Sequence, residues 1–454
     1  MKKSLLILAA SLLTLGASAQ ITYSTFWPTQ NSNFSITSAG IKYMDVVNTN
    51  VVWAVGDDGT KPNANFNEFT MTNNAGTTYT SGLMFPDTMT YHPASIEGID
   101  ATTAWVTSYL NTTGDKGAIH KTTNGGVTWV NVTPAYMYTV GGTSFADFTC
   151  FLTPTVGITL GDPAPATDFE IYRTTNGGTT WTLVPGANIP NATSGEYGLT
   201  DSYTKLGTSD IWFGTNKGRI YHSGDAGQTW SVSATGATAD VVSLAFSTPM
   251  VGIVYAYTGT TFGAYRTTNG GVTWAAITPL DPNMGKNDIT AVPGTALFAS
   301  CGAASTNTVI SYSADNGATW TNWGGNGVQY LEIEFVSNTV GYAGGFSDPG
   351  TASLLGMFKY SGVPLGVNSV GVPVATLEMY PNPSNGLITL NLTSSKEGAV
   401  INVMDAMGKV VYSENVKNAS FEKHTLNLEH LAKGIYSVNI VKAGETATQK
   451  IIIQ

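Results

Sequence analysis

The chain has 454 residues, a formal net charge of −10 and only two cysteines, so it is larger than a single small domain and is no disulfide scaffold. The acidic balance and the lack of a basic stripe argue against nucleic acid as a partner. Gly, Thr, Asn, Val and aromatic residues are plentiful, which favours short strands joined by tight turns.

The N-terminus has the features of a secretory signal. "MKK" is a charged region, "SLLILAASLLTLG" is apolar, and "ASA" before Gln20 is a small-residue cleavage site. The apolar run is shorter than the about 20 residues that a membrane-spanning helix needs. We predict a signal peptide over 1–19, export of the chain, and no transmembrane segment in the remainder.

A nine-residue stretch recurs after the signal, and its last eight residues form a repeated octad. "KTTNGGVTW" at 121–129 returns as "RTTNGGTTW" at 173–181 and "RTTNGGVTW" at 266–274. The pattern Ser/Thr–x–Asp/Asn–x–Gly–x–x–Trp has five intact copies and an eroded one that ends in Tyr79. Successive copies lie about 44–52 residues apart, the span of a four-stranded propeller blade. The residues that we expect to be structural are Asn74, Asn124, Trp129, Asn176, Trp181, Asp225, Trp230, Asn269, Trp274, Asp315 and Trp320.

The residue types of the octad suit a turn with an anchor. Asp or Asn at the third position can accept hydrogen bonds from backbone N–H groups of its own turn. Gly two residues later adopts a positive φ at no steric cost, and the Trp buries roughly 150–250 Å². We therefore interpret the octad as a structural fastener rather than as a binding site used several times.

These octads resemble Asp-box (BNR) repeats, which occur in sialidases, sortilin-type receptors and xyloglucan-cleaving propellers. The wider units, such as "VVWAVGDDG" and "DIWFGTNKGRIYHSGDAGQTW", resemble photosystem II assembly-factor-like propellers over about 40–362. The resemblance implies that each Asp-box lies on the turn between strands 3 and 4 of a blade, away from the ligand face.

A second series counts the blades. Seven apolar segments occur, six of them ahead of an octad and the seventh in a unit without one. Seven blades over 21–362 would have about 49 residues each. We predict a seven-bladed β-propeller over 20–362, closed by "ITYSTFW" (21–27). The seven segments are "NVVWAVG" (50–56), "TAWVTSY" (103–109), "TVGITLG" (155–161), "DIWFGT" (210–215), "MVGIVYAY" (250–257), "TALFASCG" (295–302) and "TVGYAGG" (339–345).

A linker of Gly, Pro, Val and Ser follows at 363–373, and the composition then changes. The region 374–454 contains about seven short alternating segments, which predict a small β-sandwich. The ordered motifs PNP, D-x-x-G-K, L-x-x-G-x-Y and a final strand with Lys resemble the type A sorting domain of the type IX secretion system. The resemblance implies a Bacteroidota-type source, the type IX machinery as a partner, and a secreted or outer-membrane-surface location.

The ligand face is predicted from variation within the chain. The loops between strands 2 and 3 vary from "GTNKGR" (214–219) to "GDDGTKPNANFNEF" (56–69), whereas the octad turns stay nearly constant. We expect ligand contacts from these loops and the neighbouring connections, although ordinary solvated turns would look the same. The charged candidates are Asp58, Asp162, Glu196, Lys217, Arg219, Lys286 and Asp348.

Motifs for catalysis are weak. Sialidases hold a carboxylate with three arginines, but two of the three here, Arg173 and Arg266, directly precede an octad. No zinc-type His spacing and no G-x-S-x-G elbow occur, so no catalytic residue, metal or cofactor is assigned. We predict a non-catalytic module that binds a glycan, a peptide or a protein; the alternative is a glycoside hydrolase that uses loop carboxylates, among them Asp168 and Asp201.

The two cysteines, Cys150 and Cys301, belong to different repeat units three apart in order. Export would permit a disulfide between them. Two buried thiols are the favoured interpretation, and the core must then supply the stability.

Overall fold

The structure is a computed structural model that describes residues 26–58, 66–85, 91–110, 116–139, 144–163, 168–259, 261–304, 306–324, 328–346, 356–362, 378–391, 399–405, 410–416, 424–442 and 445–454. The expected signal peptide (1–19) and linker (363–373) lie outside these residues. The chain divides into two compact units, Met1–Gly366 and Val367–Gln454. The described part is all-β apart from one short 3₁₀ helix, η1 (Gly186–Asn188).

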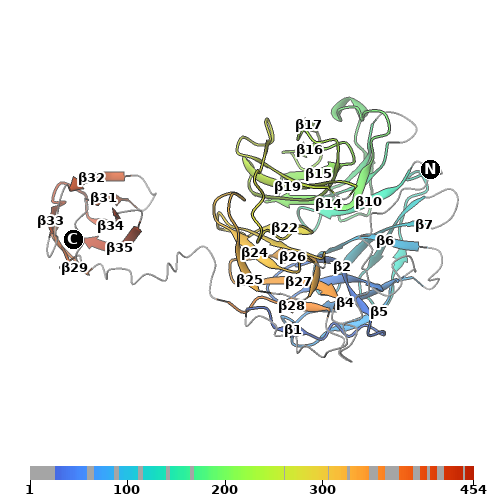
Figure 1. Cartoon of the computed structure of the whole chain (residues 1–454), viewed down its shortest axis with the longest axis horizontal. Coiled ribbons are helices and arrows are strands. Elements are labelled where there is room, and N and C mark those ends of the chain that lie inside the picture. Colours follow the sequence, from blue (N-terminus) through green and yellow to red (C-terminus); the bar gives the residue numbers. More distant parts are fainter. Residues whose placement is uncertain are drawn as a thin grey trace. The chain divides into compact units, whose positions relative to one another are not determined.

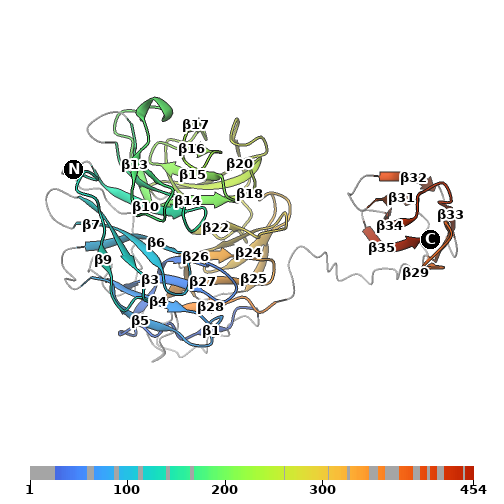
Figure 2. The ribbon, with the colours of Figure 1, turned by 180° about the vertical axis from the view of Figure 1, so that it is seen from behind.

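The described residues of the first unit form seven four-stranded antiparallel sheets, the blades, which Figures 1 and 2 show around a common centre. Blades 1 to 3 are β2 (Ala39–Asp45), β3 (Val52–Asp58), β4 (Glu68–Thr72) and β5 (Thr80–Leu83); β6 (Tyr91–Gly98), β7 (Ala104–Leu110), β8 (Gly117–Thr122) and β9 (Val130–Asn131); and β10 (Ala146–Phe151), β11 (Gly157–Gly161), β12 (Glu170–Thr174) and β13 (Thr182–Leu183).

Blades 4 to 6 continue in the same order. They are β14 (Gly198–Leu206), β15 (Asp210–Thr215), β16 (Arg219–Ser223) and β17 (Ser231–Ala234); β18 (Asp240–Thr248), β19 (Val251–Thr258), β20 (Thr261–Thr267) and β21 (Ala275–Ala276); and β22 (Asp288–Ala291), β23 (Phe298–Cys301), β24 (Ile310–Ser313) and β25 (Thr321–Gly324). Each of the seven apolar segments that counted the blades overlaps the second strand of one blade, so the predicted blade number is confirmed.

Blade 7 is built from both ends of the first unit. Its strands are β26 (Gln329–Phe335), β27 (Gly341–Phe346), β28 (Met357–Lys359) and, from the N-terminal side, β1 (Thr29–Gln30). The closing strand therefore follows the expected segment 21–27, of which 21–25 lie outside the described residues. Trp27 is fully buried beside Trp323, Phe335 and Tyr360, which ties this end of the chain to blade 7.

All six octads, the eroded copy included, form the same hydrogen-bonded turn between the third and fourth strands. In blade 2, Asn124 Oδ1 accepts the N–H of Thr128 at 3.0 Å, and Thr122 Oγ1 accepts the N–H of Gly126 at 3.0 Å. A positive φ of 83° at Gly126 lets the turn close. The corresponding bonds recur around Asn74, Asn176, Asp225, Asn269 and Asp315.

The octads also fasten one blade to the preceding one. A Cβ on Gly126 would lie closer than 3.0 Å to the ring of Phe69 in blade 1, and one on Gly178 would meet Trp105 in blade 2 in the same way. The ring of Trp129 is 6.0 Å from that of Trp53 in blade 1, centroid to centroid. The glycine thus serves close packing between blades as well as the turn itself.

The second unit forms two sheets of its own in the described residues. One contains β29 (Glu378–Tyr380), β30 (Leu387–Asn391) and β33 (His424–Asn427), and the other contains β31 (Ala399–Met404), β32 (Val410–Val416), β34 (Gly434–Lys442) and β35 (Glu445–Ile453). A separate core lies within this unit; it includes Ile388, Leu390, Ile401, Val438 and Ile451. Seven strands in two sheets agree with the expected small sandwich.

Candidate functional site

The antiparallel order of the strands gives the propeller two ends. The loops between second and third strands open at the same end as the connections between blades, and we call this end the loop face. The octad turns lie at the opposite end, the box face. Propellers combine a uniform scaffold with variable loops, so the loop face is the first place to look for a ligand site.

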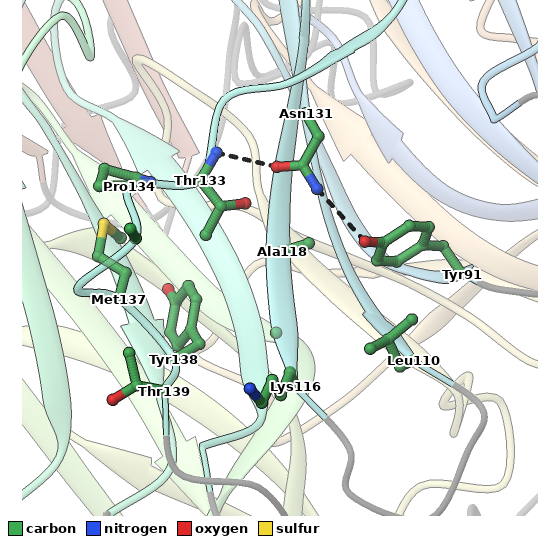
Figure 3. A pocket seen from close by; sticks show the side chains of 12 residues that line it. Tyr91, Leu110, Lys116, Ala118, Asn131, Thr133, Pro134, Met137, Tyr138 and Thr139 are labelled. Atoms are coloured by element: carbon green, nitrogen blue, oxygen red, sulfur yellow. Dashed lines mark hydrogen bonds between the residues drawn. The ribbon is translucent and has the colours of Figure 1, made fainter.

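A pocket of about 240 Å³ lies at the loop face of blade 2. The ends of β6, β7 and β8, the short β9 and the connection to blade 3 surround it (Figure 3). Figure 3 shows Tyr91 and Leu110 on one side and Met137, Tyr138 and Thr139 on the other. We call it the Tyr91 pocket; its lining is Tyr91, Leu110, Lys116, Gly117, Ala118, Asn131, Thr133, Pro134, Ala135, Met137, Tyr138 and Thr139.

Hydrogen bonds organise one wall of the Tyr91 pocket. Thr133 donates its backbone N–H to Asn131 Oδ1 at 3.0 Å, and Asn131 Nδ2 donates to Tyr91 Oη at 3.3 Å (Figure 3). Lys116, which is exposed, adds a positive charge at the rim. The pocket therefore offers hydroxyl, amide and ammonium groups beside aromatic and aliphatic surface.

His120 lies next to this pocket and is enclosed by neighbouring side chains. Its ring is buried against Phe85 and Tyr91, with centroids 4.4 and 4.8 Å away, and Ser108 Oγ is 3.1 Å from its Nδ1. Burial lowers the pKa of His120 to about 4, so the ring is neutral near neutral pH. Ser108 is also fully buried, which keeps a substrate away from this Ser–His pair.

Two of the predicted ligand residues are buried and hydrogen-bonded within the propeller. Asp58 at the end of β3 accepts a bond from Ser38 Oγ at 2.8 Å. Asp162, just after β11, accepts the backbone N–H of Gly198 in blade 4 at 2.8 Å. Both side chains hold the loop face together from the inside.

Glu196 and Arg219 form an ion pair between the connection into blade 4 and the start of β16. Glu196 is buried and also accepts bonds from the N–H of Thr193 at 2.7 Å and from Thr215 Oγ1 at 2.8 Å. The sequence placed both charges at this face but gave no sign of their partnership. Lys217, in the loop between β15 and β16, is half-buried.

The remaining predicted residues are Lys286 and Asp348. Lys286 lies half-buried in the connection that leads into blade 6. Its ammonium group is 5.9 Å from the centroid of the Phe262 ring. Asp348 lies outside the described residues. The described members of the predicted set are therefore spread over several blades and are not gathered around one cavity.

A second group of charged side chains projects from the innermost strands, and the sequence analysis missed it. Lys205 Nζ in β14 lies 2.6 Å from Glu97 Oε1 in blade 2 and 4.0 Å from Asp45 Oδ1 in blade 1, so these contacts cross the ring. Asp201, which we expected in a loop, lies in β14 instead. We call the carboxylates the central acidic cluster; its members are Asp45, Glu97, Asp201, Asp288, Glu332 and Glu334.

Most of the cluster has a structural task. Four of its members each accept a backbone N–H from the innermost strand of the following blade or, for Val46, from the residue directly after that strand. These bonds join neighbouring blades at the centre of the ring. The bonds are Asp45 to Gly98 at 2.6 Å, Glu97 to Phe151 at 2.8 Å, Asp288 to Ile333 at 2.8 Å and Glu334 to Val46 at 2.7 Å. Buried carboxylates need such partners, and here the partner is the next blade.

Burial raises the pKa values of the carboxyl groups in the cluster, and repulsion between them adds to this in most members. Burial, followed by repulsion from Asp288 and Asp201, raises the pKa of Glu332 well above its ordinary range. Burial alone would lower the pKa of Lys205, but the carboxylates of Glu97 and Asp45 outweigh it and raise that pKa. In the part of the chain that the structure describes, no group of three or more His, Cys, Asp or Glu side chains could hold a metal ion.

Cys150 and Cys301 are both free and buried, in β10 and β23, as the favoured interpretation of the sequence had it. Burial raises the pKa of each thiol well above its ordinary value, so neither is a reactive thiolate.

Comparison with known proteins identifies the tail. Residues 378–454 match the family described as "Secretion system C-terminal sorting domain". No curated protein matches the chain in sequence. The described residues contain no helix long and apolar enough to cross a membrane.

Solved structures share the fold of the first unit. "YCF48 bound to D1 peptide" has a TM-score of 0.50 and 16% identity, over 74% of this chain and 97% of that one. YCF48 from Cyanidioschyzon merolae has a TM-score of 0.51 and 15% identity, over 74% and 98%. An ancestral GH74 enzyme has a TM-score of 0.49 and 13% identity, over 94% of this chain and 63% of that one.

The fold and the tail together describe the molecule. The chain is a β-propeller followed by a sorting domain of the type IX secretion system. Such a tail indicates secretion to the cell surface or the extracellular space and contact with the secretion machinery. At these identities the structural likeness concerns the fold alone.

Proposed function

We propose that this protein is an exported, non-catalytic binding module, with a signal peptide over 1–19, whose propeller takes a glycan, peptide or protein ligand on its loop face. One observation carries the proposal. Among the described residues, the Tyr91 pocket has no aspartate or glutamate in its lining, although it offers Lys116, Asn131 and Tyr91 for contact.

The bonding of the nearby carboxylates supports the same conclusion. A glycoside hydrolase needs two carboxyl groups facing the scissile bond, about 5–9.5 Å apart and free to exchange a proton with substrate. Asp58, Asp162 and Glu196 are instead buried and committed to bonds within the protein. Lys217 and Lys286 remain candidates for outer contacts on the same face.

The test measures binding and hydrolysis in the same samples. The full chain without residues 1–19 is screened against glycans, polysaccharides and peptides, and the release of reducing ends is recorded alongside binding. We expect binding without turnover, weakened by Tyr91→Ala and by Lys116→Ala. Leu183→Ala, an exposed position on the outer strand β13, is the matched control and should bind normally.

Turnover of any bound polysaccharide would overturn the proposal in favour of the glycoside hydrolase. Loss of the turnover in Asp288→Asn or Glu332→Gln would then place the reaction at the central acidic cluster. Unchanged binding by both pocket variants would move the ligand site away from the Tyr91 pocket.

A further inference from the structure

Basic side chains tie several blades to the Asp-box turn of the next blade. Each comes from the third strand and donates to the carbonyl at the fourth octad position. Lys121 Nζ reaches Gly177 O at 3.2 Å, Arg173 Nε reaches Ala226 O at 2.7 Å, and Lys359 Nζ reaches Ala75 O at 2.7 Å. This carbonyl is therefore a recurrent acceptor for a cationic group at the box face.

Aromatic rings support two of these cations. The Lys121 ammonium lies 4.4 Å from the ring centroid of Trp105, and that of Lys359 lies 5.7 Å from Tyr342. In both cases the ring belongs to the residue that pairs with the lysine on the second strand. A cation near an aromatic face gains electrostatic stabilisation in addition to its hydrogen bond.

The pattern is not continued in every blade: Met71 takes the equivalent position in blade 1, and the pattern is also interrupted between blades 4 and 5. His222 occupies the equivalent position, and its ring lies parallel to that of Trp212, its strand partner, with centroids 4.5 Å apart. Its Nε2 is 3.0 Å from Asp210 Oδ1. Among the described residues, no hydrogen bond joins His222 to Gly270, the fourth octad residue of blade 5.

A pocket of about 170 Å³ lies at this place. We call it the Gly270 pocket; its lining is Trp212, Ile220, His222, Ser231, Val232, Ser233, Gly270, Gly271, Val272 and Trp274. The half-buried Trp274 forms an aromatic wall and donates its indole N–H to Ser233 Oγ at 3.0 Å. Neither lysine nor arginine occurs among these lining residues, and the segment 20–373 has 11 basic against 23 acidic residues.

We propose that the Gly270 pocket binds the ammonium or guanidinium group of a lysine or arginine side chain that a partner protein presents to the box face. The inserted group would donate to the Gly270 carbonyl, as Lys121, Arg173 and Lys359 do within the chain. Asp210, on the far side of His222, adds a negative charge nearby. The acidic character of the propeller would attract a basic partner segment.

The first experiment uses n-butylammonium as the probe of the pocket and n-butanol as its neutral counterpart. Binding to the full chain is followed by NMR through the amide signals of Gly270 and Gly271 and the indole N–H signal of Trp274. We expect saturable shifts of these signals with the cation and at least about tenfold weaker binding of the alcohol. Equal binding of the two probes, or no saturable shift, overturns the proposal.

Two variants give the matched comparison. His222→Lys places an ammonium group in the position that Lys121 has in blade 2, so it should raise the melting temperature and abolish binding of n-butylammonium. Lys121→Ala removes the internal cation at Gly177, and n-butylammonium should partly restore its melting temperature. Undiminished binding by a folded His222→Lys protein contradicts the proposal. If that variant does not fold, the comparison of cation and alcohol on the native chain decides.

A basic partner peptide is tested last. A short lysine-containing peptide should shift the same signals and compete with n-butylammonium, whereas the peptide with norleucine in place of lysine should not. Equal competition by the norleucine peptide would show that the pocket recognises apolar surface and would contradict the proposal. This site and the Tyr91 pocket are at opposite ends of the propeller, so each can fail without the other.

Discussion

The carboxylate of Asp225 serves its own turn. Its Oδ1 accepts the N–H groups of Gln228 at 3.0 Å and Thr229 at 2.9 Å, and its Oδ2 accepts the Thr229 hydroxyl at 2.6 Å. Burial tends to raise the pKa of Asp225, but these hydrogen bonds outweigh it and lower that pKa. A side chain used in this way stabilises the turn chiefly when it is ionised.

Replacing Asp225 therefore has a predictable cost. Asp225→Ala leaves two turn N–H groups without their acceptor and should lower the free energy of unfolding by about 1–3 kcal/mol, measured by urea denaturation. Val272→Ala, at an exposed position of another octad, is the control and should change little. Weaker ligand binding at unchanged stability would instead make this octad a binding site.

The contribution of Glu332 to stability has the opposite dependence on pH from that of Asp225. Its pKa is raised in the folded protein by burial and by its acidic neighbours, so the folded chain keeps a proton that the unfolded chain loses above about pH 4.5. The stabilising contribution is complete below that pH and is lost as the pH rises through the folded-state pKa. Asp225, with a lowered pKa, instead loses its contribution as the pH falls.

The prediction for Glu332 concerns the change of melting temperature with pH. The melting temperature of the native chain should fall as the pH is raised from mildly acidic to alkaline values, and Glu332→Gln should flatten this fall. Asp201, Asp288 and Glu334 face the same region and leave a residual slope. A Glu332→Gln protein with the slope of the native chain would show that Glu332 is ionised throughout.

At the scale of the element, the glycine of the Asp-box meets two requirements: a positive φ in its own turn and close packing against the preceding blade. Gly207, in the turn between β14 and β15, meets only the first. Gly178 has a φ of 75°, and a Cβ there would lie closer than 3.0 Å to Trp105 of the preceding blade. Gly207 has a φ of 63°, but a Cβ there would meet nothing within 4 Å. A side chain at Gly207 would therefore meet backbone strain alone, whereas one at Gly178 would meet backbone strain and crowding between blades.

Alanine at each position tests that separation. Gly207→Ala should cost about 1–2 kcal/mol through the left-handed backbone alone. Gly178→Ala should cost about 1–3 kcal/mol more, because Trp105 and its blade must move. Both are measured as changes in the free energy of unfolding. Equal costs at the two positions would mean that the blades yield easily and that the octads fasten them only weakly.

The sequence predicts those elements whose information is local. The octad contains its own acceptor, glycine and aromatic residue, and the second strand of each blade is a short apolar run, so both were found by spacing alone. The local pattern did not show that Gly178 touches Trp105 of the preceding blade. Contacts between repeats depend on how the blades turn around the centre.

The candidate site was less predictable for a related reason. Charge in a loop identified Asp58, Asp162 and Glu196, but the partners that bury them are distant in sequence or hidden in the turn geometry. The central acidic cluster was missed because Asp45 and Glu97 lie in strands that look like ordinary core. An acid in the midst of such a strand, as in "LEIEF" (331–335), is the signal that could have found it.

At the scale of the whole molecule, the propeller and the tail have separate cores. The core of the second unit includes Ile388, Ile401 and Val438, and the cores of the propeller are formed between blades. The ring is closed by pairing of β1 with β28, so the first unit needs no strand from the tail. Each unit therefore has the means to fold alone.

Deletion of 374–454 tests this division and the role of the tail together. All ten tryptophans precede residue 324, so tryptophan fluorescence reports on the propeller alone, and its melting transition should be unchanged in the truncated protein. Because the deleted residues include the sorting domain, the shortened protein should remain in the periplasm of a host that has the type IX system. Cell fractionation and surface biotinylation, with the full chain in the same host as control, measure this. Surface labelling at the level of the full chain would show that export proceeds without the sorting domain, whereas a lost transition would show that the propeller depends on the tail.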